Sequence, residues 1–270
     1  MRSETESPPI GEASASGGEE RFVKLRRLNI AAACLHFVSG LAMILLSTDM
    51  KVPVMTSFLK FDFTTQSLVP DSKIWFHLPL GIVIASFLFL SAIAHFLISL
   101  PGINGWYNRN LAKGINIARW IEYSLSSSIM IVVISMLVGI SDIAALIPIF
   151  LVNASMILFG WMMELHNQST NGKTNWTAFI FGCIAGIAPW LVIGLYLWSP
   201  GSASNPPGFV YWIFFSIFVF FNIFAVNQVL QYKKVGGWRD YLYGERAYII
   251  LSFVAKSVLA WQVFAGTLRP

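Results

Sequence analysis

Seven long apolar segments constrain this chain more than any other feature of its sequence. They cover roughly residues 28–47, 74–100, 115–138, 142–163, 176–198, 209–232 and 247–268. A helix rises about 1.5 Å per residue, so roughly 20 residues cross the hydrocarbon core of a bilayer, and each segment reaches or approaches that length. Lipid offers the backbone no hydrogen bonds, and no alternating barrel pattern is present. We therefore predict an all-α membrane protein with a bundle of seven transmembrane helices.

The composition supports lipid as the solvent. Hydrophobic residues make up 56% of the 270 residues and charged residues only 11%, whereas about a quarter of a soluble domain is charged. The net charge of +5 is concentrated at the ends of the apolar segments. This distribution suits an anionic membrane surface and does not resemble a nucleic-acid-binding face. We expect a multi-pass protein of the cell membrane, embedded in the lipid bilayer.

Lysine and arginine residues predict the orientation of the bundle. With the N-terminus in the cytoplasm, the cytoplasmic flanks hold eleven of them: Arg21, Lys24, Arg26, Arg27, Arg109, Lys113, Lys173, Lys233, Lys234, Arg239 and Arg246. The opposite side holds four: Lys51, Lys60, Lys73 and Arg269. The positive-inside rule therefore places the N-terminus in the cytoplasm and the C-terminus outside.

The segments outside the spans complete the predicted organisation. Residues 1–21 are rich in Ser, Gly, Glu and Pro without an apolar stretch, so we expect a disordered cytoplasmic tail rather than a signal peptide. Residues 22–270 form the seven-helix domain. Its first extracellular loop, about residues 48–73, mixes β-branched and aromatic residues with Pro and Thr. This mixture favours a short β-hairpin, with an irregular loop as a close alternative.

A lysine in the seventh span, Lys256, is the first candidate for a functional residue. It lies nine residues past Ala247, roughly 13 Å into the span, where a charged side chain costs on the order of 3 kcal/mol. Three interpretations are open: an ion pair with an acid on another helix, a transporter site, or a covalent imine with an aldehyde. Burial favours the neutral amine, which is the form that reacts with an aldehyde.

Glu122 on the third span is the predicted partner of Lys256. It lies nine residues past Lys113, and both helices enter the membrane from the same side, so the two side chains should lie at similar depth. The alternative partner of the carboxylate is Arg119, one turn earlier on the same helix.

Further polar residues surround this predicted pair. Ser252 lies one turn before Lys256 on the same helix face and is placed to hydrogen-bond its nitrogen. His36 and His95, in the cytoplasmic halves of the first two spans, could hold or exchange a proton, although ordinary packing explains each of them equally well. No third ligand accompanies the histidines, so we expect no metal site.

The fifth and sixth spans offer a slot for a flat ligand. Trp190 follows the kinking residue Pro189, and the sixth span carries the Phe-dense sequence YWIFFSIFVFFNIF. A polyene would fit between them, with Met156 as an adaptable wall residue. Helix packing accounts for most of these aromatic residues.

Four blocks of the sequence resemble the heliorhodopsins, which are retinal-binding membrane proteins of inverted topology. The blocks are ARWIEYSLSSSIMIVVI, VNASMILFGW, FGCIAGIAPW and GERAYIILSFVAKSVLAWQVFAGTL, on the third, fourth, fifth and seventh spans. They fall in order within a match to nearly all of residues 22–270, which is more specific than any single motif. The resemblance implies a rhodopsin-like bundle.

The resemblance also implies the chemistry of the site. Lys256 would form the protonated Schiff base of all-trans retinal, with Glu122 as counterion and Ser252 as hydrogen-bonding neighbour. His36 and His95 would belong to a polar cavity on the cytoplasmic side that is involved in accepting the proton. The remaining residues assigned to the retinal site are Tyr123, Ser127, Met156, Trp190 and Trp261. The family is also dimeric, so we expect a homodimer.

These observations predict a light sensor that passes its signal to a cytoplasmic protein without net ion transport. No nucleophile–base pair, nucleotide-binding loop or HExxH motif is present, so we expect no enzymatic activity. Between Glu122 and the outer surface there is no second intramembrane acid, which disfavours a proton pump. A light-driven or light-gated ion transporter stays open as an alternative, as does a structural membrane protein that binds no chromophore.

Overall fold

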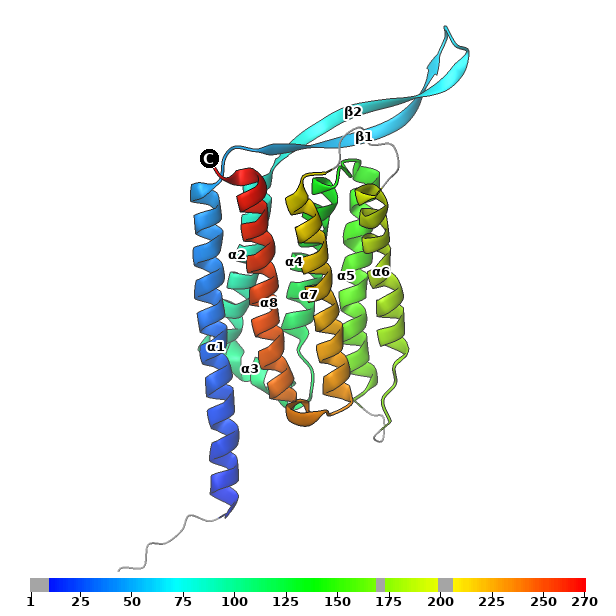
Figure 1. Cartoon of the computed structure of the whole chain (residues 1–270). Helices are drawn as coiled ribbons and strands as arrows, with labels where there is room; N and C mark the ends of the chain where they lie inside the picture. Colours follow the sequence, from blue (N-terminus) through cyan, green and yellow to red (C-terminus); the bar gives the residue numbers. More distant parts are fainter. Residues whose placement is uncertain (1–9, 169–172, 199–205) are drawn as a thin grey trace, which may run out of the picture.

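The structure, a computed structural model, describes residues 10–168, 173–198 and 206–270. Within these residues, seven helices are long and apolar enough to cross a membrane, which confirms the predicted number of spans. In chain order the elements are α1 (Ile10–Leu46), β1 (Lys51–Asp62), β2 (Ser67–Pro79), α2 (Leu80–Ser99), α3 (Pro101–Ala112), α4 (Ile117–Leu137), α5 (Ile143–His166), α6 (Thr177–Leu197), α7 (Gly208–Tyr232), η1 (Gly236–Arg239), α8 (Tyr241–Val263) and η2 (Phe264–Leu268). Figure 1 shows the long helices side by side in one bundle.

Two predicted spans have different boundaries in the structure. The sequence predicts the second span at 74–100, but residues 74–79 belong to β2 and α2 begins at Leu80. It predicts the seventh at 247–268, but α8 begins at Tyr241, where the Asp240 carboxylate accepts a hydrogen bond from the Leu242 backbone N–H at 3.0 Å and caps the helix. The earlier start makes Glu245 part of a helix of the bundle.

The first helix also begins earlier than the sequence predicts. Residues 10–21, part of the expected tail, are helical, and residues 1–9 lie outside the described part of the chain. Glu20 and Lys24 form an ion pair at 2.7 Å one turn apart, and Arg21 forms another with Asp240. These ion pairs support a polar extension of α1, which reaches beyond the ends of the other helices (Figure 1).

The loop between the first two spans forms the predicted β-hairpin, and the hairpin is longer than expected. β1 pairs antiparallel with β2 from Lys51 opposite Pro79 to Asp62 opposite Ser67. Its backbone joins the bundle where the Met55 N–H donates to the Ser141 carbonyl at 2.8 Å. Figure 1 shows the hairpin lying across one end of the bundle, beside the C-terminus, and we call this end the hairpin face.

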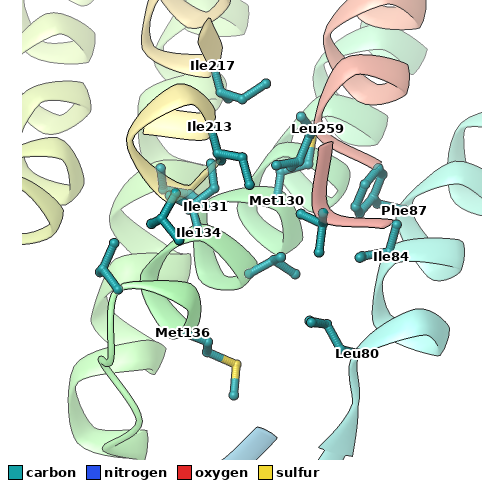
Figure 2. Packing of buried hydrophobic residues seen from close by; sticks show 14 of the residues in the cluster. Leu80, Ile84, Phe87, Met130, Ile131, Ile134, Met136, Ile213, Ile217 and Leu259 are labelled. Atoms are coloured by element: carbon teal, nitrogen blue, oxygen red, sulfur yellow. The ribbon is translucent and has the colours of Figure 1, made fainter. Parts of the chain in front are cut away.

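The half of the bundle next to the hairpin face is packed with apolar side chains. In Figure 2, residues of α2, α4, α7 and α8 point toward one another: Ile84, Phe87, Met130, Ile131, Ile134, Ile213, Ile217 and Leu259. Each of them is at most 2% exposed. The perimeter is apolar as well, since Trp212 is 72% and Leu195 70% exposed. Large apolar side chains on an outer surface fit a bundle that faces lipid.

Candidate functional site

The site centres on one buried ion pair between α4 and α8. Lys256 Nζ lies 2.7 Å from Glu122 Oε1, and the two residues are 3% and 6% exposed. Each charge alone would be costly in a bundle surrounded by lipid, and a charge of opposite sign at this distance offsets much of that cost. The structure thus brings together the two residues that the sequence pairs.

Two serine hydroxyls hold the ion pair from opposite sides. Lys256 Nζ donates to Ser252 Oγ at 2.9 Å, as expected for residues one turn apart on the same face of α8. Ser91 Oγ of α2 donates to Glu122 Oε1 at 2.6 Å. Sequence reasoning missed Ser91, although it lies one turn before His95 on the same helix face and that spacing could have pointed to it.

The alternative pairing of Glu122 with Arg119 is wrong. The Arg119 guanidinium binds Glu164 of α5 at 2.5 Å and also forms an ion pair with Glu245 of α8. Its Cζ also lies over the rings of Trp120, 4.3 Å from the ring centroid, and Tyr248, at 3.9 Å, and these two rings pack edge to face against each other. Arg119 is therefore held away from Glu122 by a separate set of contacts.

The two histidines lie beside each other near the ion pair. The rings of His36 and His95 stack with centroids 5.9 Å apart, and His95 Nδ1 lies 2.7 Å from Asn29 Oδ1. Asn29 Nδ2 donates to the Leu25 carbonyl, which fixes Oδ1 as the acceptor, so Nδ1 of neutral His95 carries the hydrogen. His95 Nε2 has no hydrogen-bond partner among the described residues.

Two neighbouring cavities extend from Lys256 toward α6. The inner cavity, of about 50 Å³, is lined by Lys256, Ser252 and residues of α4, α5 and α7. The aromatic cavity, of about 290 Å³, lies between α5, α6 and α7 and reaches Trp190. The two share the lining residues Tyr123, Met156, Ile157, Phe221 and Phe224. Together they form an apolar, largely aromatic path that begins at a buried amine.

Four of the predicted wall residues line this path. Tyr123 and Met156 line both cavities, Ser127 lines the inner one and Trp190 the aromatic one. Trp190 packs edge-on against Phe218 and Phe221 of α7, with ring centroids 5.2 and 5.4 Å apart. Trp190 and the sixth span, α7, are thus in contact and share the wall of the aromatic cavity, and a polyene between them stays a prediction.

Trp261 is the one predicted wall residue outside these two cavities, and its assignment to the retinal site stays a prediction. Trp261 is 37% exposed, packs against Phe264 and lines neither cavity. It lies five positions after Lys256, which turns its side chain about 140° around the helix axis from the lysine. Ser252, four residues before Lys256, lies on the same face.

Asn153 of α5 is a second residue that sequence reasoning missed. Its Nδ2 donates to Ser127 Oγ at 2.9 Å and to Ser128 Oγ at 3.0 Å, and the residue is 1% exposed. Ser127 Oγ in turn donates to the Tyr123 carbonyl at 2.7 Å. A buried amide in a lipid-facing helix is the signal that could have revealed this contact.

A comparison with known protein families identifies the family to which this chain belongs. The family model of the heliorhodopsins matches residues 25–268, nearly the whole chain. The chain belongs to the heliorhodopsin family. Among curated proteins, none matches it. Membership makes this heliorhodopsin a retinal-binding, light-responsive membrane protein with several spans.

The residues around Lys256 fit retinal. An amine that could bind the aldehyde lies at one end of an apolar path, and aromatic side chains line the rest of it. A Cβ atom on Gly186 would lie 2.5 Å from Met156 Sδ, so the glycine lets Met156 pack against α6 at the cavity wall. Nothing charged other than Lys256 lines either cavity among the described residues, which suits a polyene chain.

Proposed function

We propose that Lys256 holds all-trans retinal covalently through Nζ and that this heliorhodopsin is a light sensor. One observation carries the proposal: Nζ is buried, charge-paired with Glu122 at 2.7 Å, and belongs to a residue that lines the apolar path toward Trp190. A merely structural ion pair would need no such path beside it.

The chain supplies the electrostatics and the orientation, and retinal supplies the response to light. When bound, retinal absorbs visible light and changes shape. The Glu122 carboxylate would stabilise a positive charge at Nζ and keep a proton there, because both groups are buried. Ser252 would orient Nζ, and Ser91 would hold the carboxylate in place. Phe221, Phe224 and Trp190 would exclude water from the path.

A proton that leaves Nζ has acceptors on the side of the bundle away from the hairpin face. The carboxylate of Glu122 is the nearest, and His95 Nε2 offers an unpartnered lone pair in the same buried region. His36 stacks on His95, and we propose that it belongs to the same network. We propose that the network takes the proton and that the resulting charge shift is transmitted to the surface opposite the hairpin.

The opposite half of the bundle supports a sensor over a transporter. Between Lys256 and the hairpin face, the described helices bury no Asp, Glu, His, Lys or Arg. Asp142 caps α5 at that face, where hydrogen bonds from Ser57 and the Ala144 backbone hold the pKa of its carboxyl below the usual value. Asp142 therefore stays ionised in a capping role, and a proton relay across the membrane is incomplete.

We expect no stationary photocurrent from this protein. When it is expressed in a cell and illuminated under voltage clamp, any signal should be a transient that decays while the light is on. A steady current under continuous light would favour the transporter alternative, and a light-driven proton pump expressed in the same cells would provide the positive control.

Trp190 and Trp261, the two tryptophans that the sequence assigns to the retinal site, should behave differently when replaced. Trp190→Ala is expected to shift the visible band and lower retinal loading several-fold, because its ring lines the aromatic cavity. Trp261→Ala is expected to leave the band in place, because its ring lines neither cavity. Absorption spectra of the two variants, normalised to protein, measure the difference. Equal effects of the two substitutions would contradict the placement of retinal along this path.

We further propose the orientation and assembly that the sequence suggests. The eleven basic residues of the predicted cytoplasmic flanks support an N-terminus inside the cell and a hairpin outside. The exposed basic residues Lys233, Lys234 and Arg239 near η1 form a surface that a cytoplasmic signalling protein could contact. The protein would act as a homodimer. Labelling of single cysteines placed in the hairpin of intact cells tests the orientation, and chemical cross-linking in membranes tests the dimer.

A single spectrum tests the central proposal. Added all-trans retinal should give the purified, retinal-free protein a visible absorption band that reaches one chromophore per chain. A folded protein that stays colourless with retinal would overturn the assignment of Lys256 and the sensor function together.

A further inference from the structure

A second cluster of buried charges lies between the Lys256 site and the end of the bundle opposite the hairpin. It consists of Arg119, Glu164 and Glu245, which are 5%, 2% and 0% exposed, and we call it the acid–arginine cluster. The guanidinium contacts both carboxylates, Glu164 at 2.5 Å. One cation facing two buried acids leaves one negative charge without a partner. Such a charge is costly in a low-dielectric interior unless it can take up a proton.

The two carboxylates differ in how well they are held in the ionised form. Glu164 accepts four hydrogen bonds and Glu245 accepts two. The donors to Glu164 are the Asn116 backbone N–H (2.9 Å), Trp120 Nε1 (2.6 Å), Tyr241 Oη (2.9 Å) and Arg119 Nη2 (2.5 Å). The donors to Glu245 are Arg119 Nη1 and Asn116 Nδ2, the latter at 2.6 Å. Because donors stabilise the carboxylate, Glu245 is the acid that more readily takes a proton.

The cavities on either side of the cluster point to the same residue. A cavity of about 30 Å³ is lined by Glu245, Arg119, His95 and Glu122, and we call it the polar cavity after these side chains. Most of its remaining wall is apolar, and it has room for about two water molecules. Glu164 does not line it. Instead, Glu164 and Tyr241 line a separate polar vestibule of about 500 Å³, with the exposed residues Lys113, Lys233, Lys234 and Arg239. Glu245 therefore faces the inner site, Glu164 faces the outer vestibule, and Arg119 lies between them.

We propose that Glu245 is a proton-binding site that receives its proton across the polar cavity from the Glu122–His95 region. An O–H bond forms on the Glu245 carboxylate as the bond to hydrogen breaks at Glu122 or His95, and the cluster goes from one net negative charge to none. Arg119, bound to Glu164, lies between this cavity and the vestibule. That the proton originates at Lys256 rests on the proposed function, whereas proton binding by Glu245 does not.

Other titratable groups face the cluster. The exposed cations Lys113, Lys233, Lys234 and Arg239 line the vestibule beside Glu164 and do not line the cavity that Glu245 faces. The remaining titratable groups lie on the neighbouring helices. They are Tyr107 of α3, Tyr232 of α7, Tyr241 and Tyr248 of α8, and, across the polar cavity, Glu122 of α4 and His95 of α2. From α1, the polar cavity is lined by Asn29, which does not titrate. Arg119 Nε has no hydrogen-bond partner among the described residues, so one donor of the cluster is also available.

Infrared spectroscopy of the retinal-free protein tests the site without any chromophore. As the pH is lowered, a C=O stretching band of a buried, protonated carboxylic acid should grow in. Glu245→Gln should abolish the band, and Glu245→Asp should keep it at a shifted frequency. Glu164→Gln should move the band to lower pH, because Arg119 then has Glu245 as its single acidic partner. The Asp variant guards against misfolding of the Gln variant. A band that survives in folded Glu245→Gln, or that keeps its frequency in Glu245→Asp, would overturn the proposal.

Light-minus-dark infrared spectra of the retinal-loaded protein test where the proton comes from. The same band should appear after a flash, and Glu245→Gln should remove it while the visible band remains. A band that titrates in the retinal-free protein but never appears after a flash would refute proton transfer from Lys256 to Glu245. It would leave Glu245 as a proton-binding site. A protein that forms no visible band would refute the proposed function, while the titration would still decide proton binding by Glu245.

Discussion

Replacement of Lys256 by Ala or by Arg is expected to abolish the visible absorption band of the retinal-loaded protein. The reason is chemical, because only a primary amine at this position can bind the aldehyde of retinal covalently. The measurement is an absorption spectrum after incubation with excess retinal and removal of the unbound ligand. We expect the whole band to be lost in both variants rather than shifted.

The two substitutions differ in their effect on the fold, which makes them a useful pair. Lys256→Ala leaves the Glu122 carboxylate buried without a cation, and breaking a buried pair in this way costs about 3–5 kcal/mol. Lys256→Arg keeps a positive charge beside Glu122 and should stay closer to the stability of the wild type. Lys113→Ala, at an exposed lysine, should keep the full band. A variant without Lys256 that still forms a stable visible band would contradict the assignment.

The parts of the site that could be predicted from the sequence are the charged residues within apolar segments, because a lipid environment restricts which partners they can have. A lysine and a glutamate deep within two apolar segments must find partners, so the contact between Lys256 and Glu122 was predictable. Ser252 followed from helix geometry alone, since it lies one turn from Lys256. The span count followed from length and hydropathy, because each crossing needs its own apolar segment.

The acid–arginine cluster could not be predicted because its acids lie at the ends of apolar segments. The sequence places Glu164 one residue past the fourth predicted span and Glu245 two residues before the seventh. In the structure both belong to long helices, α5 and α8, and both are buried. Arg119 therefore has two partners on other helices, whereas the sequence suggested only its near neighbour Glu122. Knowledge of the true start of α8 would have been enough to bring Glu245 into consideration.

The sequence also did not show toward which neighbouring helix a given side chain points. A resemblance assigns Trp190 and Trp261 to the retinal site alike, and only the three-dimensional packing separates them. Ser91 and Asn153 were missed for a related reason. Each is a polar residue on an apolar helix, and its role depends on the facing residues of α4, which the sequence of its own helix does not contain.

Glu122→Gln is expected to move the visible band to longer wavelength. The carboxylate lies 2.7 Å from Nζ and stabilises the state in which positive charge is concentrated there. Light absorption moves that charge away from Nζ, so loss of the carboxylate raises the ground state more than the excited state. The change in transition energy should not exceed about 3–5 kcal/mol, which is what an unpaired buried charge costs. Absorption spectra of wild type and variant at the same pH measure it.

Two controls separate the charge of Glu122 from its shape. Glu122→Asp keeps the charge and should move the band less than Glu122→Gln, which keeps the shape and removes the charge. Ser91→Ala removes the hydroxyl that donates to Glu122 Oε1 at 2.6 Å and should cause a smaller shift still, because the carboxylate remains. An unmoved band in Glu122→Gln would show that Glu122 does not serve as the counterion of Lys256. A larger shift in Ser91→Ala than in Glu122→Gln would instead locate the decisive interaction outside the ion pair.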